Sequence, residues 1–372
     1  MGSDKQIQKA GDGSQQNQAT YMIINNGITE ERARAICSEV ALKAIAECTE
    51  EAEKTAKERI DQFAGFFIPR LQQIEEGFQS FTDPAFQVLL RKAQLTAACT
   101  GCEENYKILS ELLVHRVKNR ENVKKKASIT KAVEILDQID EDSLLGLTVF
   151  HSMRQFAPTT GEVKQGLNVL DSLYAKYDLD NLPTGDSWID NLAILGAITT
   201  SSVGSLKKFP VFLTEVLSGY VCAGIKKESE EYEKAIEILR ENGLATVFID
   251  NELLEGYSRI STPNLSVISN VTGLIRVGVK DLEPSFEMPV TVTPNDIQRK
   301  AILSIISMYD NNISLINQVK ERFNNMLTSF PAISKAIAWW DSLKPAILLS
   351  SVGRVIAHTN AKSIDPTLPE LD

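Results

Sequence analysis

The stretch GITEERARAICSEVALKAIAECTEEAEKTAKERIDQFAGFF, residues 27–67, decides the fold class of this chain. Apolar or small side chains recur in it at every third or fourth position, from Ala33 to Phe67. This spacing predicts one face of a long α-helix that starts near Thr29 and ends or kinks at Pro69. Because that face is rich in alanine, we expect a close contact with another helix, either in an antiparallel hairpin or between subunits.

Helical periodicity continues to about residue 224 and predicts an all-helical domain over residues 28–225. Asp83-Pro84 has the form of a capping residue followed by proline in the first helical turn. No repeat of fixed length is found, so a solenoid is not predicted. The expected helices of this domain are 84–99, 103–118, 129–139, 144–153, 161–177 and 188–224.

The pattern changes from residue 226 onward, where prolines separate short apolar runs. A second core is expected because 372 residues exceed the roughly 250 to 300 that one core usually serves. We therefore predict a mainly α fold with a smaller α+β domain over 226–362 and a loose tail over 363–372. The expected helices are 228–241, 296–308, 313–328, 333–343 and 352–360, and the expected strands are 246–249, 274–279, 290–292 and 346–349.

Residues 1–27 form a leader rich in Gln, Asn and Gly, with too few apolar side chains for a core. Two interpretations stay open. One is a disordered tail, and the other is an oligomerisation arm whose turn at Asp12-Gly13 and short strand-like stretches pair between copies of the chain. The candidate oligomerisation residues are Ile7, Asp12, Gly13, Gln15, Gln16, Asn17, Gln18, Tyr21 and Ile23.

Composition excludes several classes of protein. A formal net charge of −10 disfavours non-specific nucleic-acid binding. The N-terminus has no apolar signal region, so the cytoplasm is the default expectation. The longest uncharged stretch, 192–206, is shorter than the roughly 20 residues that cross a bilayer, and we expect no membrane association. Five scattered cysteines indicate reduced thiols rather than a disulfide framework.

No motif of catalysis or metal binding stands out. Cys99 and Cys102 form a CxxC pair, but the first cysteine lies at a predicted helix end, where no helix dipole activates it. The three histidines, His115, His151 and His358, have no metal-ligand spacing. Nucleophile-elbow, P-loop and dinucleotide-binding patterns are lacking. We therefore predict no catalytic, cofactor-binding or metal-binding residue, although a Ser-His-Asp arrangement formed in space stays open.

One basic run is a candidate for phosphate contact. A solvated loop with cations near a helix C-terminus explains the same pattern, and both interpretations stay open. The run consists of Arg116, Lys118, Arg120, Lys124, Lys125 and Lys126.

Four segments carry a resemblance to a known family. Residues 11–19 (GDGSQQNQA) and 27–34 (GITEERAR) resemble an uncharacterised bacterial family of mostly helical proteins, and 253–259 (LLEGYSR) and 349–357 (LSSVGRVIA) look like further motifs of it. The last segment is also similar to the closing strand and turn of winged-helix-like units. The resemblance implies a winged-helix-like C-terminal region and no assigned activity. The leader is similar to segments ahead of unrelated bacterial domains, some linked to phage defence, which implies a portable assembly element.

Three hypotheses of function follow. The first is a non-enzymatic bacterial protein, accessory to phage defence, that self-associates through residues 5–26 and the alanine-rich face of its first helix and binds an unidentified protein partner. The second is a nucleic-acid-binding regulator or sensor that uses the winged-helix-like C-terminal region or the basic run. The third is an enzyme of unrecognised type.

Overall fold

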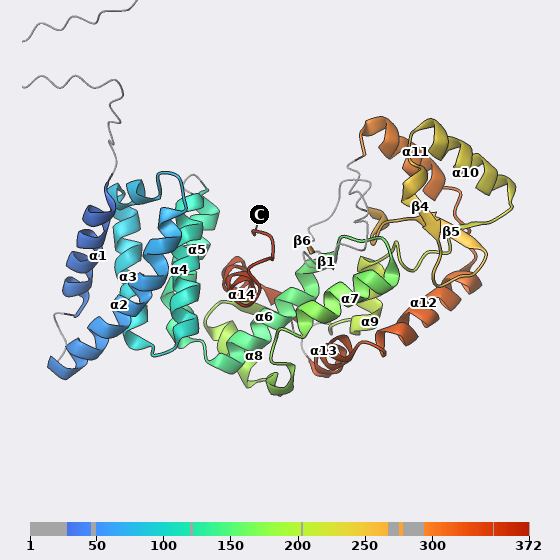
Figure 1. Ribbon diagram of the computed structural model, residues 1–372. Coiled ribbons are helices and arrows are strands. Elements are labelled where there is room, and N and C mark those ends of the chain that lie inside the picture. Colours follow the sequence, from blue (N-terminus) through green and yellow to red (C-terminus); the bar gives the residue numbers. More distant parts are fainter. Residues whose placement is uncertain are drawn as a thin grey trace, which may run out of the picture.

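Helices arranged in three neighbouring groups make up most of the molecule (Figure 1). The computed structural model describes residues 28–45, 50–119, 122–201, 204–266, 275–277, 294–344 and 346–371. Within these ranges, a main core extends from Ala33 to Leu368 and a smaller core lies between Ile225 and Tyr309. The predicted fold class, mainly α with a smaller α+β part, is confirmed.

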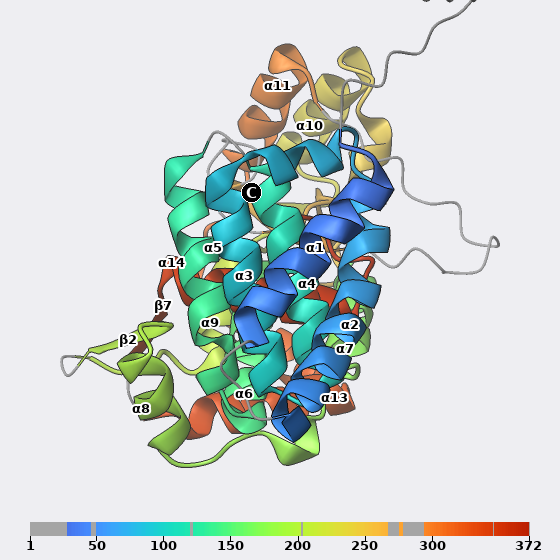
Figure 2. The ribbon, with the colours of Figure 1, turned by 90° about the vertical axis from the view of Figure 1, so that its left-hand side faces the viewer.

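The first group is a bundle of five helices, seen from its outer side in Figure 2. Asp83 caps the third of them by accepting a hydrogen bond from the Ala85 backbone N–H at 2.9 Å. The predicted helices 84–99 and 103–118 are confirmed at both ends. The five helices are α1 (Glu30–Ile45), α2 (Glu50–Gln72), α3 (Pro84–Cys99), α4 (Glu103–Lys118) and α5 (Val123–Ile135).

The stretch expected to form one long helix forms two, α1 and α2, which pack against each other. A signal for the second start is present in the sequence. Thr49-Glu50-Glu51 repeats the pattern of Thr29-Glu30-Glu31, a capping residue followed by acids that favour the positive end of a helix. Pro69 does not end α2, which continues for three more residues to Gln72 although the proline removes one hydrogen bond of the helix.

Several described residues of the alanine-rich face lie inside the first bundle. Ala33 is fully buried and Ala56 is 6% exposed, and the surrounding side chains come from α3 and α4 of the same chain. On α3, the Gln94 side-chain amide donates to the Cys37 carbonyl at 3.0 Å and fixes α1 against it. The close helix contact made by Ala33 and Ala56 is therefore intramolecular, whereas Ala52 on the same face is exposed.

Helices from both halves of the sequence form the second group. In the first half these are α6 (Glu141–Gln155), α7 (Val163–Tyr174), α8 (Ser187–Ile194) and α9 (Phe209–Val216). The second half adds α12 (Ile313–Leu327), α13 (Pro331–Ser342) and α14 (Ser351–Ile364). Helix α14 packs against α4, α5 and α6, with Ile356, Ala357 and Ala361 fully buried. The main core therefore crosses the domain boundary that we expected at residues 225 and 226.

Two short strands lie in the region expected to be wholly helical. Strand β1 (Phe156–Pro158) pairs in parallel with β6 (Ile275–Val277), and β2 (Ile198–Ser201) pairs antiparallel with β7 (Ala346–Leu349). The prediction of one helix over 188–224 is wrong, because Gly196 (φ 73°) turns the chain after α8 and β2 follows. Each strand pairs with a segment more than 100 residues later, which local periodicity cannot reveal.

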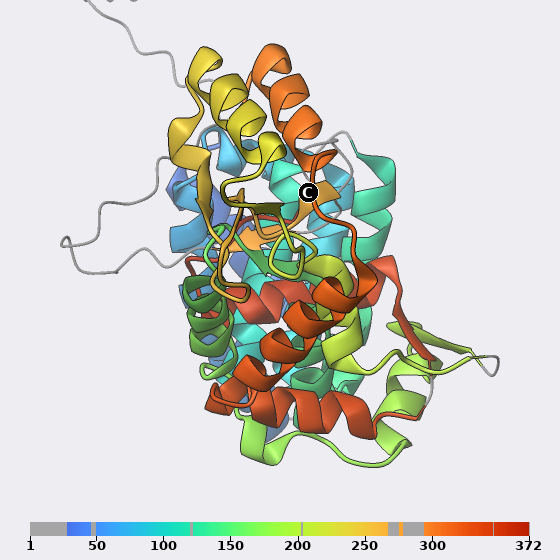
Figure 3. The same cartoon turned by 90° about the vertical axis from the view of Figure 1, so that its right-hand side faces the viewer.

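A small α+β lobe forms the third group, shown from its outer side in Figure 3. Its three-stranded antiparallel sheet has the order β3-β5-β4 and carries α10 and α11. The expected strand at 290–292 lies outside the described residues. The elements are β3 (Ile225–Lys226), α10 (Glu230–Glu241), β4 (Phe248–Asp250), β5 (Tyr257–Ile260) and α11 (Asp296–Ile306).

The C-terminal segments differ from expectation. Residues 349–357, which resembled the closing strand and turn of a winged-helix unit, end β7 and begin α14, away from the sheet of the lobe. The tail expected to be loose folds back instead, with Leu368 4% exposed in the main core. None of the helices in the described ranges combines the length and hydrophobicity that crossing a bilayer requires.

Candidate functional site

The structure describes most of the residues predicted for phosphate contact and none of those predicted for oligomerisation. The nine oligomerisation residues, from Ile7 to Ile23, and Arg120 of the basic run all lie outside the described residues. Arg116 is buried, with its guanidinium Nη2 3.6 Å from the Asp83 carboxylate. Lys118 is exposed and pairs with Glu370.

The other three lysines of the run lie at the start of α5. Lys124, Lys125 and Lys126 occupy its first turn, after the cap residue Asn122, which accepts a hydrogen bond from the Lys125 backbone N–H at 3.1 Å. Cations at the positive end of a helix are electrostatically unfavourable by themselves. The described residues of the run therefore do not form one continuous basic surface.

Lys118 belongs instead to a cluster around one carboxylate. The Glu370 carboxylate accepts from Lys118 Nζ at 3.0 Å and from Lys362 Nζ at 2.6 Å. His115 Nε2 lies 3.0 Å from the other carboxylate oxygen. The hydrogen bond from His115, with those from Lys362 and Lys118, lowers the pKa of Glu370 well below its ordinary value. Sequence spacing could not find this cluster, because His115 and Glu370 are 255 residues apart.

Beneath this cluster lies a pair of buried histidines. His358 Nε2 is 2.9 Å from the Pro369 carbonyl oxygen, and His358 Nδ1 is 3.2 Å from His151 Nε2. Because a carbonyl only accepts, His358 carries its proton on Nε2, and His151 Nε2 donates to His358 Nδ1. Burial lowers the pKa of His151 to about 3 and that of His358 to about 4. Both imidazoles are therefore neutral near pH 7 and serve as hydrogen-bonding core residues.

A buried arginine in the lobe has few partners. Arg259 in β5 is fully buried, and its Nε and Nη2 atoms find no hydrogen-bond acceptor in the described part of the chain. Its Nη1 donates to the Ile260 carbonyl at 3.3 Å, and its guanidinium carbon lies 5.8 Å from the centre of the Tyr220 ring. A buried charge with so few partners destabilises the fold.

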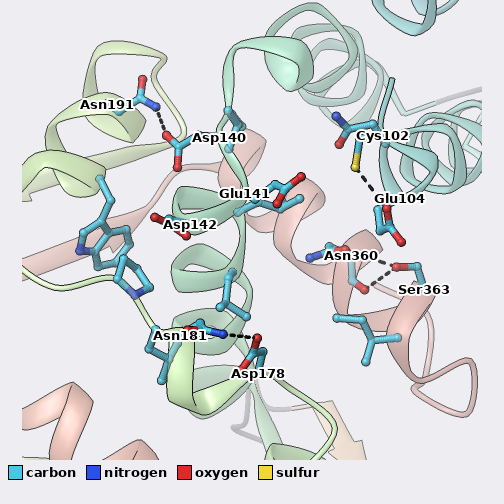
Figure 4. A pocket seen from close by; sticks show the side chains of 18 of the residues that line it. Cys102, Glu104, Asp140, Glu141, Asp142, Asp178, Asn181, Asn191, Asn360 and Ser363 are labelled. Atoms are coloured by element: carbon cyan, nitrogen blue, oxygen red, sulfur yellow. Dashed lines mark hydrogen bonds between the residues drawn. The ribbon is translucent and has the colours of Figure 1, made fainter. Parts of the chain in front are cut away.

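An acidic cleft of about 1350 Å³ lies between the start of α4, α6, α8 and the end of α14 (Figure 4). Its floor is apolar and its rim carries carboxylates. Figure 4 shows Glu141 between Asp140 and Asp142 on one side and Glu104 on the other. The apolar side chains are Ile139, Leu144, Leu145, Leu182, Pro183, Trp188 and Ile364, and the acidic ones are Glu104, Asp140, Glu141, Asp142, Asp178 and Asp180.

Helix starts position the acids of the cleft. Asp140 caps α6, where its carboxylate accepts from the Ser143 backbone N–H at 2.7 Å and from the Asn191 side chain at 2.8 Å. Although partial burial raises it, these hydrogen bonds hold the pKa of Asp140 below its ordinary value. Glu141 and Asp142 follow in the first turn, where the helix dipole favours negative charge.

The acidic cleft carries a large excess of negative charge. Its lining contains one lysine, Lys107, and that lysine pairs with Glu103 at 2.9 Å. Asp180 pairs with Lys335 at 2.6 Å. Within the described residues, no cation pairs with Glu141 or Asp142.

The CxxC pair is not arranged for redox chemistry. Cys99 ends α3, and Cys102 precedes α4 at the edge of the acidic cleft. The Cys102 thiol donates to the Glu104 carboxylate at 3.2 Å. Burial and this hydrogen bond raise the pKa of Cys102, so the reactive thiolate is disfavoured. In the described ranges, no three His, Cys, Asp or Glu residues gather as they would around a metal ion.

Comparison with known proteins gives a family but no activity. No curated protein and no solved structure matches the chain. A family model matches residues 27–368, from the first residue of the GITEERAR motif to the buried Leu368. That range covers all three groups of helices. The chain therefore belongs to this family, which is uncharacterised.

Proposed function

We propose that the protein acts by binding other proteins, without catalysis, and that it presents its acidic cleft to a positively charged segment of a partner. The observation that carries the proposal is the combination of an apolar floor with an acidic rim on which Glu141 and Asp142 have no cationic partner among the described residues. Protein interfaces share this plan, with an apolar centre that excludes water and a polar rim.

The floor supplies the contact area. Trp188 is 4% exposed and Leu182 8% exposed, so both present only a small part of their surface to the cleft. Contact with a partner's apolar side chain would remove that part from water, worth about 25 cal/mol per Å². Because the area is modest, the floor would position a partner rather than hold it alone.

The rim supplies selectivity. Glu141 and Asp142 project from the start of α6, and a Lys or Arg that pairs with them would meet no competing cation among the described residues. Opposite charges on two surfaces accelerate association and fix the orientation of the partner. The segment that fits best therefore carries apolar side chains flanked by Lys or Arg.

Three polar side chains of the acidic cleft have structural partners, which favours a binding role over a reactive role for them. Asn360 donates to Thr148 Oγ1 at 2.9 Å, and the Ser363 hydroxyl donates to the Asn360 carbonyl at 2.8 Å. Asp178 accepts from the Asn181 side chain at 2.8 Å. A general base or nucleophile would need a free, activated group in this position.

Self-association through the leader remains part of the proposal. Its support is the composition of residues 5–26, which bury too little apolar surface alone but can pair between copies. An assembly would present several acidic clefts together and raise the avidity for a multivalent partner. A bacterial source, a cytoplasmic location and a role accessory to phage defence are proposed on the resemblance of the leader.

The second hypothesis, nucleic-acid binding, stays a prediction. Of its candidate residues, Arg116 is buried against Asp83, and Lys118 is held by Glu370. Lys124, Lys125 and Lys126 remain as the residues to test by charge reversal at low salt.

Charge-neutral variants of the rim test the acidic cleft. A fluorescent peptide of Lys, Arg and Leu serves as the probe, and anisotropy reports its binding to the full chain. The double variant Glu141→Gln, Asp142→Asn is expected to weaken binding about tenfold, because two ion pairs at the exposed rim are lost.

The matched control is Glu230→Gln, Glu231→Gln, two acids in the first turn of α10 in the lobe. It has the same change of net charge and is expected to bind the probe within about twofold of the parent. Equal weakening by both double variants would show non-specific attraction to an acidic protein and would reject the acidic cleft as the site.

A further inference from the structure

Residues 365–371, here called the strap, turn after α14, with the Leu368 backbone N–H bonded to the Asp365 carbonyl at 3.1 Å, and then lie on the protein as a bound peptide would. Pro366 and Pro369 prevent it from continuing α14. Leu368 is 4% exposed in the main core, and Leu371 packs against the same core. Pro369 gives its carbonyl to His358, as described above. Two apolar anchors thus flank one acidic side chain, Glu370.

The acidic side chain lies among more positive charge than it can balance. Glu370 contributes one negative charge, whereas Lys118 and Lys362 contribute two positive charges and His115 adds a third donor. Lys362 is 19% exposed and His115 8% exposed, so these groups are partly withdrawn from water before any partner arrives. A carboxylate in this position is favoured by the lower local dielectric.

We propose that the surface covered by the strap is a binding site for an acidic segment of a partner protein, and that Glu370 occupies it in cis. The partner segment would carry a carboxylate between apolar side chains, as the strap does. Lys118 and Lys362 would hold that carboxylate, and the pockets of Leu368 and Leu371 would take its apolar neighbours. This site is separate from the acidic cleft and opposite to it in charge.

The structure contains a point at which the strap can separate. Asp365 ends α14, with its backbone N–H bonded to the Ala361 carbonyl at 2.8 Å. Its carboxylate accepts from Lys176 Nζ at 2.7 Å and from the Thr367 hydroxyl at 2.6 Å. Asp365 is buried, so the end of α14 would remain fixed while the residues after it exchange, a step that breaks the hydrogen bonds from Thr367 and Leu368 to Asp365.

Two members of the cluster are accessible to a competitor. The Glu370 side chain is 48% exposed and that of Lys118 is 42% exposed. The strap is part of the same chain and competes for the site at an effective concentration of the order of millimolar. A separate peptide therefore binds poorly until the strap loses the charge of Glu370. The strap therefore sets the affinity that a partner must exceed.

Removal of the Glu370 charge tests the proposal on the full chain. The probe is a fluorescent peptide with the sequence of residues 364–371, Ile-Asp-Pro-Thr-Leu-Pro-Glu-Leu, and a second peptide carries Gln in place of the Glu. The Glu370→Gln chain is expected to bind the acidic peptide at least about ten times more tightly than the unmodified chain does. The same variant is expected to bind the acidic peptide about ten times more tightly than the Gln peptide. A chain that ends at Asp365 is expected to bind the acidic peptide at least as well.

Two further changes, each made in the Glu370→Gln chain, locate the site. Lys118→Gln is expected to remove the gain in affinity, whereas the control Lys124→Gln, on the first turn of α5, is expected to leave it within about twofold. Equal binding of the acidic peptide by the unmodified and Glu370→Gln chains, or equal binding of the Glu and Gln peptides, would overturn the proposal. So would inorganic phosphate that displaces the peptide at equal concentration, because it would indicate a site for free oxyanions.

Discussion

Lowering the pH from 7 to 5 is expected to destabilise the protein, because His151 and His358 are buried in their neutral forms. Burial lowers the pKa of His151 from 6.5 to about 3, and that of His358 from 6.5 to about 4. In the unfolded chain both imidazoles regain ordinary values and bind protons as the pH falls below 6.5. The unfolded state then holds more protons than the folded state, so the free energy of unfolding decreases as the pH falls.

The size of the effect follows from how far the pH falls below 6.5, the ordinary pKa of histidine. Between pH 6.5 and pH 5, each histidine loses about 2 kcal/mol of its contribution to the free energy of unfolding, and the pair loses about 4 kcal/mol. The loss continues until the folded-state values are reached, near pH 4 for His358 and pH 3 for His151. The carboxylates with lowered pKa, Glu370 and Asp365, lose their contribution only below about pH 4.5, outside this window.

Urea unfolding at pH 7, 6 and 5 measures this loss. Three tryptophans, Trp188, Trp339 and Trp340, are buried in the main core and provide the fluorescence signal. The variant His151→Leu is expected to lose about 2 kcal/mol less than the parent between pH 7 and pH 5, whatever its absolute stability. An equal loss in parent and variant, or a parent as stable at pH 5 as at pH 7, would refute the assignment of two buried neutral histidines.

The remaining predictions concern single sites. Gly353→Ala is expected to lower the free energy of unfolding, measured by urea titration, by about 1–3 kcal/mol or more. The reason is that a Cβ there would lie 2.0 Å from the Ala197 carbonyl oxygen. Unchanged stability would contradict the close approach of α14 to the start of β2. Arg259→Met is expected to raise the free energy of unfolding by about 1–3 kcal/mol, because it removes buried donors without acceptors, whereas a loss would indicate a partner for the guanidinium. Iodoacetamide with mass-spectrometric mapping is expected to label the exposed Cys99 before Cys37, whose pKa burial raises to about 12, and equal rates would count against that burial.

Helices with local signals could be predicted from the sequence. Asp83-Pro84 and the uninterrupted period of 103–118 fixed both ends of α3 and α4, because caps and periodicity act within a few residues. The helix predicted over 188–224 failed for the opposite reason. That segment contains β2, which pairs with β7. Strand β7 begins 145 residues after Ser201, the last residue of β2, and only folding brings the two strands together.

The sites could not be predicted for the same reason, because their residues come together only through long-range packing. Lys118 stood out within a basic run, but Lys362 and Glu370, which complete its cluster, follow it by more than 240 residues. The acids of the cleft were visible only as common helix-start residues, because their convergence depends on how α4, α6 and α8 pack. Long-range packing, and α14 above all, decides both sites.

The mass of the protein in solution tests most directly whether it works as an assembled interaction protein. Multi-angle light scattering of the full chain over a range of concentrations is expected to give a multiple of 41.1 kDa, and a chain without residues 1–26 is expected to give a single copy. A full chain that remains at 41.1 kDa throughout, or a shortened chain that keeps the multiple, would contradict the account.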